Sequence, residues 1–218
     1  REVGAGEFAA HLQMARIDAL YDLPDRRKEV PAACTALVRQ FPDHLLTPQA
    51  VYMAALASLD AEDYAAARKH ADSFVANSKY SAHELLPAVL YIAAEGYLAF
   101  LESNPEHPQA YDILKRARQA FTRAGYSDKA VWAQQELLRN LGEDRRAEDI
   151  MTLAQLEKDA GSLDSAIEHA AEAADQATDV GSRLWNRMYW AWYNQLRDGD
   201  SAGLDAYREV QREIDAAG

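Results

Sequence analysis

The stretch that decides the fold is GSLDSAIEHAAEA at residues 161–173. It opens on a turn glycine, continues to an apolar residue, and then places alanines about one helical turn apart, at Ala166, Ala170 and Ala173. Residues at this spacing lie on one face of an α-helix. Because a face of small side chains lets a second helix approach closely, the stretch predicts one half of a tightly packed helix pair.

The pattern around this stretch repeats along the chain at a nearly constant distance. A helix, a turn glycine and a second helix recur after 36 residues, and a third copy of the first helix follows 35 residues later. The aligned positions are Leu114 with Ile150, Ala117 with Leu153, Phe121 with Glu157, Gly125 with Gly161, and Ala130 with Ala166, while Trp185, Met188 and Trp192 continue the first three. A fixed period in this range indicates stacked structural repeats.

Helix-breaking residues divide the chain into about eleven segments, each near the length of a short helix. Helix-favouring residues dominate these segments, and no run of alternating β-branched residues predicts a strand. Connections as brief as these make neighbouring helices antiparallel. We therefore expect an all-α chain of helical hairpins.

The residue types at the repeated positions resemble the tetratricopeptide repeat (TPR). Residues 161–173 and 63–74 are similar to the turn and second helix of that repeat. Residues 185–192 resemble the Trp, Leu, Gly, Tyr spacing of its first helix, with Tyr189 at the position that is usually small. The resemblance implies a right-handed α-α superhelix, a TPR-like solenoid of about ten to eleven antiparallel helices.

This resemblance covers most of the chain, but its strength varies. Good matches lie at 48–78, 111–141 and 147–178, degenerate ones lie at 8–42 and 183–216, and the segment 82–104 has no clear partner helix. We expect a single TPR-like helical-repeat domain over residues 1–218, with four to six repeats and an irregular junction at 81–108.

The front half has a second, shorter resemblance. Leu37–His44, followed by residues 49–55, resembles the units of bacterial envelope TPR proteins such as the barrel-assembly lipoprotein of the outer membrane. Those units also end in an aromatic residue and proline before the next helix. The chain begins at Arg1 and shows no charged-then-apolar leader. We expect a soluble protein and leave its location open between the cytoplasm and the bacterial periplasm.

The composition narrows the classes of partner. The formal net charge of −12 repels phosphate backbones, so we expect no nucleic-acid partner. No apolar run reaches the roughly 18 to 20 residues of a membrane span, because the most apolar stretch, 85–101, contains Pro87 and Glu95. The single cysteine, Cys34, is expected to be a small buried residue on a helix.

Sequence motifs for catalysis or for metal and cofactor binding are missing. The six histidines are dispersed one per helix or loop, with no His-Glu-x-x-His and no Cys/His cluster, and are expected at the surface or in hairpin contacts. There is no Gly-Lys-Ser/Thr phosphate loop and no Gly-x-Ser-x-Gly elbow. The sequence thus predicts a protein that is not an enzyme and that needs no cofactor.

The TPR resemblance also implies a binding groove. In that family the first helices of the repeats line a concave face along which ligand peptides lie, and the alignment places ten residues on or beside it. These residues are Lys115, Gln119, Met151, Thr152, Gln155, Lys158, Arg183, Asn186, Arg187 and Trp190. Lys115, Arg183 and Arg187 fall where chaperone-binding members grip a peptide carboxylate, but Gln119 and Thr152 replace the asparagines of that clamp. A true clamp, another acidic peptide and ordinary solvated charges remain the alternatives for these cations.

An aromatic cluster stands at residues 185–193. Trp185, Tyr189 and Trp192 share one helical face and are expected in the core, whereas Trp190 and Tyr193 point elsewhere. Either neighbouring helices sandwich this helix, or the second pair contacts a partner or another copy of the chain.

Two functions follow from these features. The first is a non-catalytic scaffold or adaptor that binds a peptide or protein segment in its groove. The alternative is a helical-repeat region of a larger enzyme or signalling protein, where it serves regulation or self-association. Because function resides in sites placed on a fold, the fold by itself does not separate the two.

Overall fold

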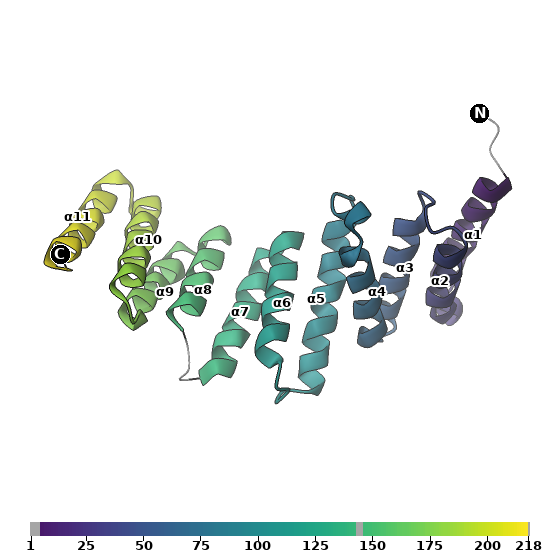
Figure 1. Ribbon diagram of the computed structural model, residues 1–218, viewed down its shortest axis with the longest axis horizontal. Coiled ribbons are helices and arrows are strands. Elements are labelled where there is room, and N and C mark those ends of the chain that lie inside the picture. Colours follow the sequence, from purple (N-terminus) through teal and green to yellow (C-terminus); the bar gives the residue numbers. More distant parts are fainter. Residues whose placement is uncertain (1–4, 143–145, 218) are drawn as a thin grey trace. The chain divides into compact units, whose positions relative to one another are not determined.

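The computed structural model describes residues 5–142 and 146–217, and these residues form an all-α protein (Figure 1). The described residues hold eleven α-helices, two 3-10 helices and no strand, which confirms the predicted fold class of about ten to eleven helices. The helices are α1 (Ala5–Asp22), η1 (Pro24–Glu29), α2 (Val30–Gln40), α3 (Thr47–Asp60), α4 (Tyr64–Ala76), η2 (Ser78–Tyr80), α5 (Leu86–Ser103), α6 (Ala110–Ala124), α7 (Ser127–Leu141), α8 (Ala147–Asp159), α9 (Leu163–Gln176), α10 (Val180–Asp198) and α11 (Asp200–Ala217).

The chain folds into two compact units. The first contains Arg1–Gln109 and Gln119–Gly125, and the second contains Ala110–Arg118 and Tyr126–Gly218. Successive helices in each unit are antiparallel neighbours joined by short turns, as the TPR resemblance implies. The expectation that residues 1–218 form a single domain stays a prediction.

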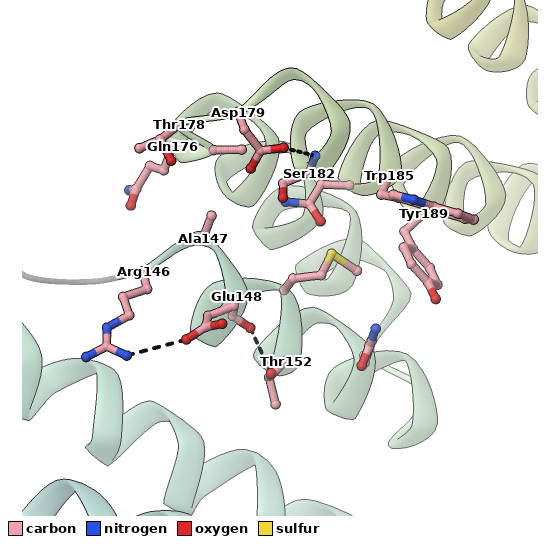
Figure 2. Close-up of a pocket in the computed structure, with 14 residues that line it drawn as sticks. Arg146, Ala147, Glu148, Thr152, Gln176, Thr178, Asp179, Ser182, Trp185 and Tyr189 are labelled. Atoms are coloured by element: carbon pink, nitrogen blue, oxygen red, sulfur yellow. Dashed lines mark hydrogen bonds and ion pairs between the residues drawn. The ribbon is translucent and has the colours of Figure 1, made fainter.

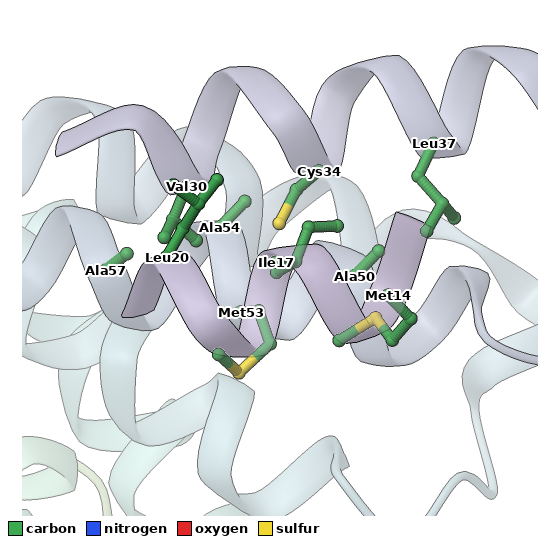
Figure 3. Close-up of a cluster of buried hydrophobic side chains, with 10 residues drawn as sticks. All are labelled: Met14, Ile17, Leu20, Val30, Cys34, Leu37, Ala50, Met53, Ala54 and Ala57. Carbon is green, nitrogen blue, oxygen red and sulfur yellow. The ribbon is translucent and has the colours of Figure 1, made fainter. Parts of the chain in front are cut away.

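The first unit has a core built from its first three α-helices (Figure 3). The buried side chains are Met14, Ile17, Leu20, Val30, Cys34, Leu37, Ala50, Met53, Ala54 and Ala57. Cys34 is fully buried here, as expected, and desolvation by burial raises the pKa of its thiol to about 12. The thiol is therefore a packing group and not a nucleophile at neutral pH.

Helix α5 corresponds to the segment 82–104, for which the sequence pattern indicates no clear partner helix. It packs against α4, and a smaller contact reaches α3. Gly96 lies at the α4 contact, where a Cβ atom would stand 3.0 Å from both the Cβ of Arg68 and the carbonyl oxygen of Tyr64. The Arg68 guanidinium then covers the rings of Tyr97 and Phe100, at 5.5 and 5.4 Å from their centroids. The two helices thus approach closely at a residue without a side chain.

The second unit contains the stretch from which the fold was predicted. Its alanines Ala166, Ala170 and Ala173 are fully buried on α9 and share one cluster with residues of α8. Tyr193 of α10 enters the same cluster and is also fully buried. Small residues therefore bring α8 and α9 together, and a large residue fills the space beside the pair.

The turn between paired helices uses a left-handed residue. Gly161 has φ of 84°, and the amide of Ser162 donates to the carbonyl of Glu157 at 2.8 Å. In the turn from α3 to α4, Glu62 takes the same place with φ of 57°, and the amide of Asp63 donates to the carbonyl of Ser58 at 2.9 Å. This is the Schellman arrangement, in which glycine is the usual left-handed residue. Glu62 is the only described non-glycine residue with positive φ.

We expect Glu62→Gly to raise the free energy of unfolding by about 1 kcal/mol, because a left-handed residue with a Cβ carries about that much strain. Urea unfolding followed by circular dichroism measures the change. The neighbouring Ala61 has φ of −87°, so Ala61→Gly is the matched control and should lower stability. If Glu62→Gly lowered the stability as much as Ala61→Gly does, the backbone at Glu62 would not be strained.

Helices α10 and α11 also meet at a glycine. A Cβ atom on Gly203 would lie 2.5 Å from the Cβ of Gln195 and 2.8 Å from its Cγ. Both contacts are shorter than packed carbon atoms tolerate, so a larger residue would push the two helices apart.

Gly203→Ala should therefore lower the free energy of unfolding by about 1 kcal/mol or more, even though alanine favours a helix over glycine. The exposed neighbour Ser201 provides the control, since Ser201→Ala gains helix propensity without meeting α10. Thermal and urea unfolding of both variants measure the two changes in the free energy of unfolding. Equal stabilisation by both substitutions would show that the helices do not touch at Gly203.

Candidate functional site

A hollow of about 720 Å³ lies in the second unit, between α8 and α10 and beside the loop that joins α9 to α10 (Figure 2). It is lined by Arg146, Ala147, Glu148, Met151, Thr152, Gln155, Gln176, Ala177, Thr178, Asp179, Ser182, Trp185, Asn186 and Tyr189. Its size is that of a site for a small molecule or a short peptide segment.

Local hydrogen bonds fix the rim of the hollow. Asp179 caps α10, and its Oδ1 accepts from the amide of Ser182 at 2.8 Å, as the dashed line in Figure 2 shows. This bond lowers the pKa of the Asp179 carboxyl. On the other side, Arg146 forms an exposed ion pair with Glu148 at 3.5 Å, and the Thr152 hydroxyl donates to the carbonyl of Glu148 at 2.8 Å. The carboxylates of Glu148 and Asp179 therefore both already have a partner within the protein, Arg146 and the amide of Ser182.

The walls combine apolar and amide groups. Trp185 and Tyr189 come from α10, and the indole of Trp185 is 62% exposed. Asn186, also on α10, is buried, and its Nδ2 donates to the carbonyl of Ala173 at 3.0 Å. Because that bond fixes the amide, the orientation of the Asn186 side chain is set before any ligand arrives. Gln155 is exposed on α8 at the same hollow.

A polar network supports α8 from the side of α6 and α7. Arg118 donates to Oε1 of Gln134 at 2.8 Å, and Nε2 of Gln134 donates to the backbone carbonyl of Asp149 at 2.8 Å. The Tyr111 hydroxyl donates to the Asp149 carboxylate at 3.1 Å. Burial and the nearby Asp149 raise the pKa of Tyr111. Buried Gln134 thus ties three consecutive helices together.

Two cations flank Tyr111 next to this network. The ammonium of Lys115 lies 5.8 Å from the ring centroid and the guanidinium of Arg146 lies 5.6 Å from it. Only Arg146 lines the hollow. Lys115, which the sequence placed at the groove, is exposed on α6 and packs on Tyr111.

The structure brings together four of the ten residues that the sequence placed at the groove. These are Met151, Thr152, Gln155 and Asn186. Of the others, Lys115, Lys158, Arg183, Arg187 and Trp190 belong to the second unit but do not line the hollow, and Gln119 belongs to the first unit. Their part in binding stays a prediction.

Arg187 has a structural partner on each side. It pairs with Asp175 of α9 at 3.0 Å and with Glu213 of α11 at 3.3 Å, and its guanidinium lies 5.8 Å from the Trp190 ring centroid. Lys158 pairs with Asp159 and lies 5.5 Å from the Trp192 ring. Lys158 and Arg187 are therefore already paired with acidic side chains of the protein itself. Arg183, in contrast, is exposed on α10.

The expectation for the aromatic cluster was wrong for residues on both faces. Trp185 and Trp192 are 62% and 37% exposed, whereas Tyr193 is fully buried. Tyr193 points between α8 and α9, the direction expected for Trp185 and Trp192. Trp190 is half-buried between the cores on either side of α10. Tyr189, which was expected in the core, does pack against the same cluster as Tyr193, so α10 is sandwiched between neighbours with its buried face rotated from Trp185 and Trp192 toward Tyr193.

Sequence reasoning missed the rim of the hollow. Gln176, Thr178, Asp179 and Ser182 belong to the α9–α10 loop and its flanking helix ends. An aspartate three residues before a serine at a helix start is a recognisable capping signal and could have located this edge. Arg146 had no comparable signal, because it was one of several charges in a run.

A half-buried histidine–carboxylate contact joins α8 and α9. Nδ1 of His169 lies 2.7 Å from Oε2 of Glu157, which is only 3% exposed. The bond to Glu157 raises the pKa of His169 above its ordinary 6.5, against the opposing effect of burial. This histidine is a hairpin contact, as the sequence predicted.

We expect His169→Gln to destabilise the protein more at pH 6 than at pH 9. Since the pKa of His169 is raised in the folded state, its stabilising charge is fully present below about pH 6.5 and is lost as pH rises through the folded-state pKa. Urea unfolding across this range measures the difference. His70 is the control: burial, then Lys69, lowers its pKa, so His70→Gln should show the opposite trend. If the effect of His169→Gln did not change with pH, a protonated His169 would not stabilise the fold through Glu157.

Two other kinds of site do not occur in the described part of the chain. Among residues 5–142 and 146–217, no group of three or more His, Cys, Asp or Glu side chains is arranged to hold a metal ion. No helix within the same residues combines the length and apolar character needed to cross a membrane.

Comparison with known proteins gives structural likeness only. No protein-family model matches the chain, and no curated protein matches it. Among solved structures it resembles MamA, residues 41 to the end, from Desulfovibrio magneticus RS-1, with 13% identity, a TM-score of 0.42 and 98% of each chain covered. It also resembles TTC0263, a thermophilic TPR protein of Thermus thermophilus, with 20% identity, a TM-score of 0.37, and 83% of this chain and 98% of that chain covered.

A third similar structure is BtubC (BKLC) from P. vanneervenii, with 15% identity, a TM-score of 0.45, and 98% of this chain and 92% of that chain covered. Identities of 20% or less and TM-scores below 0.5 transfer no partner or activity to this chain. The description of the fold as TPR-like rests on the helix pairs themselves.

Proposed function

We propose that the protein is a non-catalytic adaptor that binds an extended peptide segment of a partner protein in the hollow between α8 and α10. The observation that carries this proposal is the exposed indole of Trp185, which stands at the hollow beside Tyr189 and the thioether of Met151. Aromatic and methionine side chains next to amides suit an apolar peptide side chain together with its backbone.

The amides supply the polar half of such a site. Nδ2 of Asn186 is occupied by the Ala173 carbonyl, so the oxygen of the amide is the group left to accept from a ligand. Gln155 is exposed and can both donate and accept. An extended peptide presents N–H and C=O groups alternately along its length, which these two amides match.

The charges favour a neutral peptide over an acidic one. Arg146 is paired with Glu148, Asp179 caps α10, and Arg187 is held between α9 and α11. Lys115 and Arg183 are exposed but do not line the hollow. The support for the expected acidic segment is therefore weaker than the support for apolar contacts.

Self-association is the second candidate, favoured by an exposed apolar stripe on α10. Trp185, Met188, Trp192 and Leu196 follow one another at helical spacing and all are exposed. In this reading the stripe would contact another copy of the chain, as in an oligomerisation region of a larger protein. Sedimentation velocity over a range of concentrations separates the two candidates.

We expect Trp185→Ala to weaken peptide binding at least tenfold and Gln155→Ala to weaken it several-fold, since central tryptophans dominate such interfaces. Peptides selected from a random phage-displayed library of dodecamers are titrated by fluorescence anisotropy. Trp132→Ala is the matched control, because Trp132 is 42% exposed on α7 and does not line the hollow. Selected peptides that bind the Trp185→Ala protein normally, or a selection that yields none, would overturn the proposal.

A further inference from the structure

Three loops of the chain resemble one another, and each contains a histidine. They run over residues 41–47, 80–86 and 104–110 and lead into α3, α5 and α6. In each loop the histidine amide donates to the carbonyl three residues earlier, at 3.2 Å for His44, 3.0 Å for His83 and 3.1 Å for His107. The helix then starts three residues after the histidine in every case.

Each histidine ring accepts a hydrogen bond from the last residue before the helix that follows it, and we call this bond the histidine cap. Nδ1 accepts from the backbone amide two residues later, from Leu46 at 3.2 Å, from Leu85 at 3.2 Å and from Gln109 at 3.1 Å. An accepting Nδ1 carries no proton, so all three rings are in the neutral form with the proton on Nε2.

Neighbouring aromatic rings hold these rings in place. Phe41 lies 6.3 Å from His44, Phe74 lies 5.8 Å from His83, and Phe100 lies 5.2 Å from His107, measured between ring centroids. All three histidines are half-buried. A ring fixed in this way cannot turn away easily when its protonation changes.

We infer that His44, His83 and His107 form a set of acid-sensitive helix caps, through which mild acidification loosens the starts of α3, α5 and α6. Protonation turns Nδ1 from an acceptor into a donor, so the cap bond is lost. It also places a positive charge at the positive end of a helix dipole. Histidine is the side chain whose ordinary change of charge lies between pH 5 and 8.

The groups facing each ring add to this effect or oppose it. His11 of α1 stands edge-on to His44 at 5.4 Å, and Nε2 of His44 is buried without a hydrogen-bond partner in the described structure. A charge on His44 would therefore be buried and would face a second titratable ring. The ring of Tyr80 lies 6.3 Å from that of His83, measured between centroids.

Acidic residues adjacent in sequence oppose the effect only weakly. They are Asp43, Glu84 and Glu106, and all three are exposed to solvent, where screening is strong. Asp43 is moreover paired with Lys79 at 2.7 Å. The lost cap bond and the helix dipole therefore outweigh them.

His169 responds in the opposite sense. It is the only histidine of the second unit, and its pairing with Glu157 is strengthened by protonation. Acidification should thus loosen the helix starts that follow His44, His83 and His107, while it strengthens the contact of His169 with Glu157. The caps concern a different part of the chain from the proposed peptide site, and neither proposal depends on the other.

The test replaces the three rings with a cap that does not titrate. Asn77 of this chain already makes the same bond, its Oδ1 accepting from the amide of Lys79 at 3.1 Å. The triple variant His44→Asn, His83→Asn, His107→Asn should therefore keep its caps at every pH. Hydrogen–deuterium exchange is measured at pH 7.5 and 5.0, corrected for the intrinsic rate, in peptides covering 44–50, 83–89 and 107–113.

In the native protein we expect local opening at each of the three helix starts to become about fivefold more populated at pH 5.0, the usual effect of losing a helix cap. In the triple variant this change should disappear. His70→Gln controls for the other half-buried histidine of the unit, which itself disfavours a proton, and should leave the local change intact. The inference is overturned if the triple variant keeps the acid response, or if His70→Gln alone removes it.

A second measurement does not depend on how the variants fold. Nitrogen-15 NMR of the native protein at pH 7.5 reports which ring nitrogen carries the proton. We expect Nε2 for His44, His83 and His107. A proton on Nδ1 in these rings would show that they are not caps.

Discussion

Close contact between small side chains on paired helices is the constraint on which the rest of the structure depends. The buried alanines Ala166, Ala170 and Ala173 let α9 lie against α8, and residues without a side chain serve the same purpose at Gly96 and Gly203. Once paired helices are this close, large residues fill the remaining space, as Tyr193 does. The width of the hollow between α8 and α10 follows from that spacing, because α9 supports both helices.

Helix α10 shows how one helix serves three purposes through three faces. One face enters the core with Tyr193, a second is tied to α9 and α11 through Arg187, and a third leaves Trp185 exposed at the hollow. The first two faces fix the position of the helix, so the exposed indole is presented by a rigid support. A binding residue on such a support loses little conformational entropy when a ligand arrives.

Histidine has two opposite uses in this chain. His169 is favoured by a proton because it neighbours the buried carboxylate of Glu157, whereas the rings of His44, His83 and His107 accept hydrogen bonds that a proton would break. The same side chain therefore stabilises one contact and weakens the others as pH falls. Whether protonation stabilises or destabilises the fold depends on the group that faces Nδ1, which is a carboxylate oxygen at His169 and a backbone amide at the other three histidines.

The sequence by itself determined the all-α class, the helix pairs and the turn at Gly161, since these depend on residues close together along the chain. Four of the residues that the TPR resemblance implied for a groove also line the hollow, whereas their part in binding stays a prediction. The sequence predicted Trp185 in the core and Tyr193 elsewhere, whereas packing against α8 and α9 buries Tyr193 and leaves Trp185 exposed. The sequence could not show that Arg187 is held by Asp175 and Glu213, as those partners come from other helices. Only the tertiary structure decides such contacts, because burial and charge pairing depend on which elements meet in space.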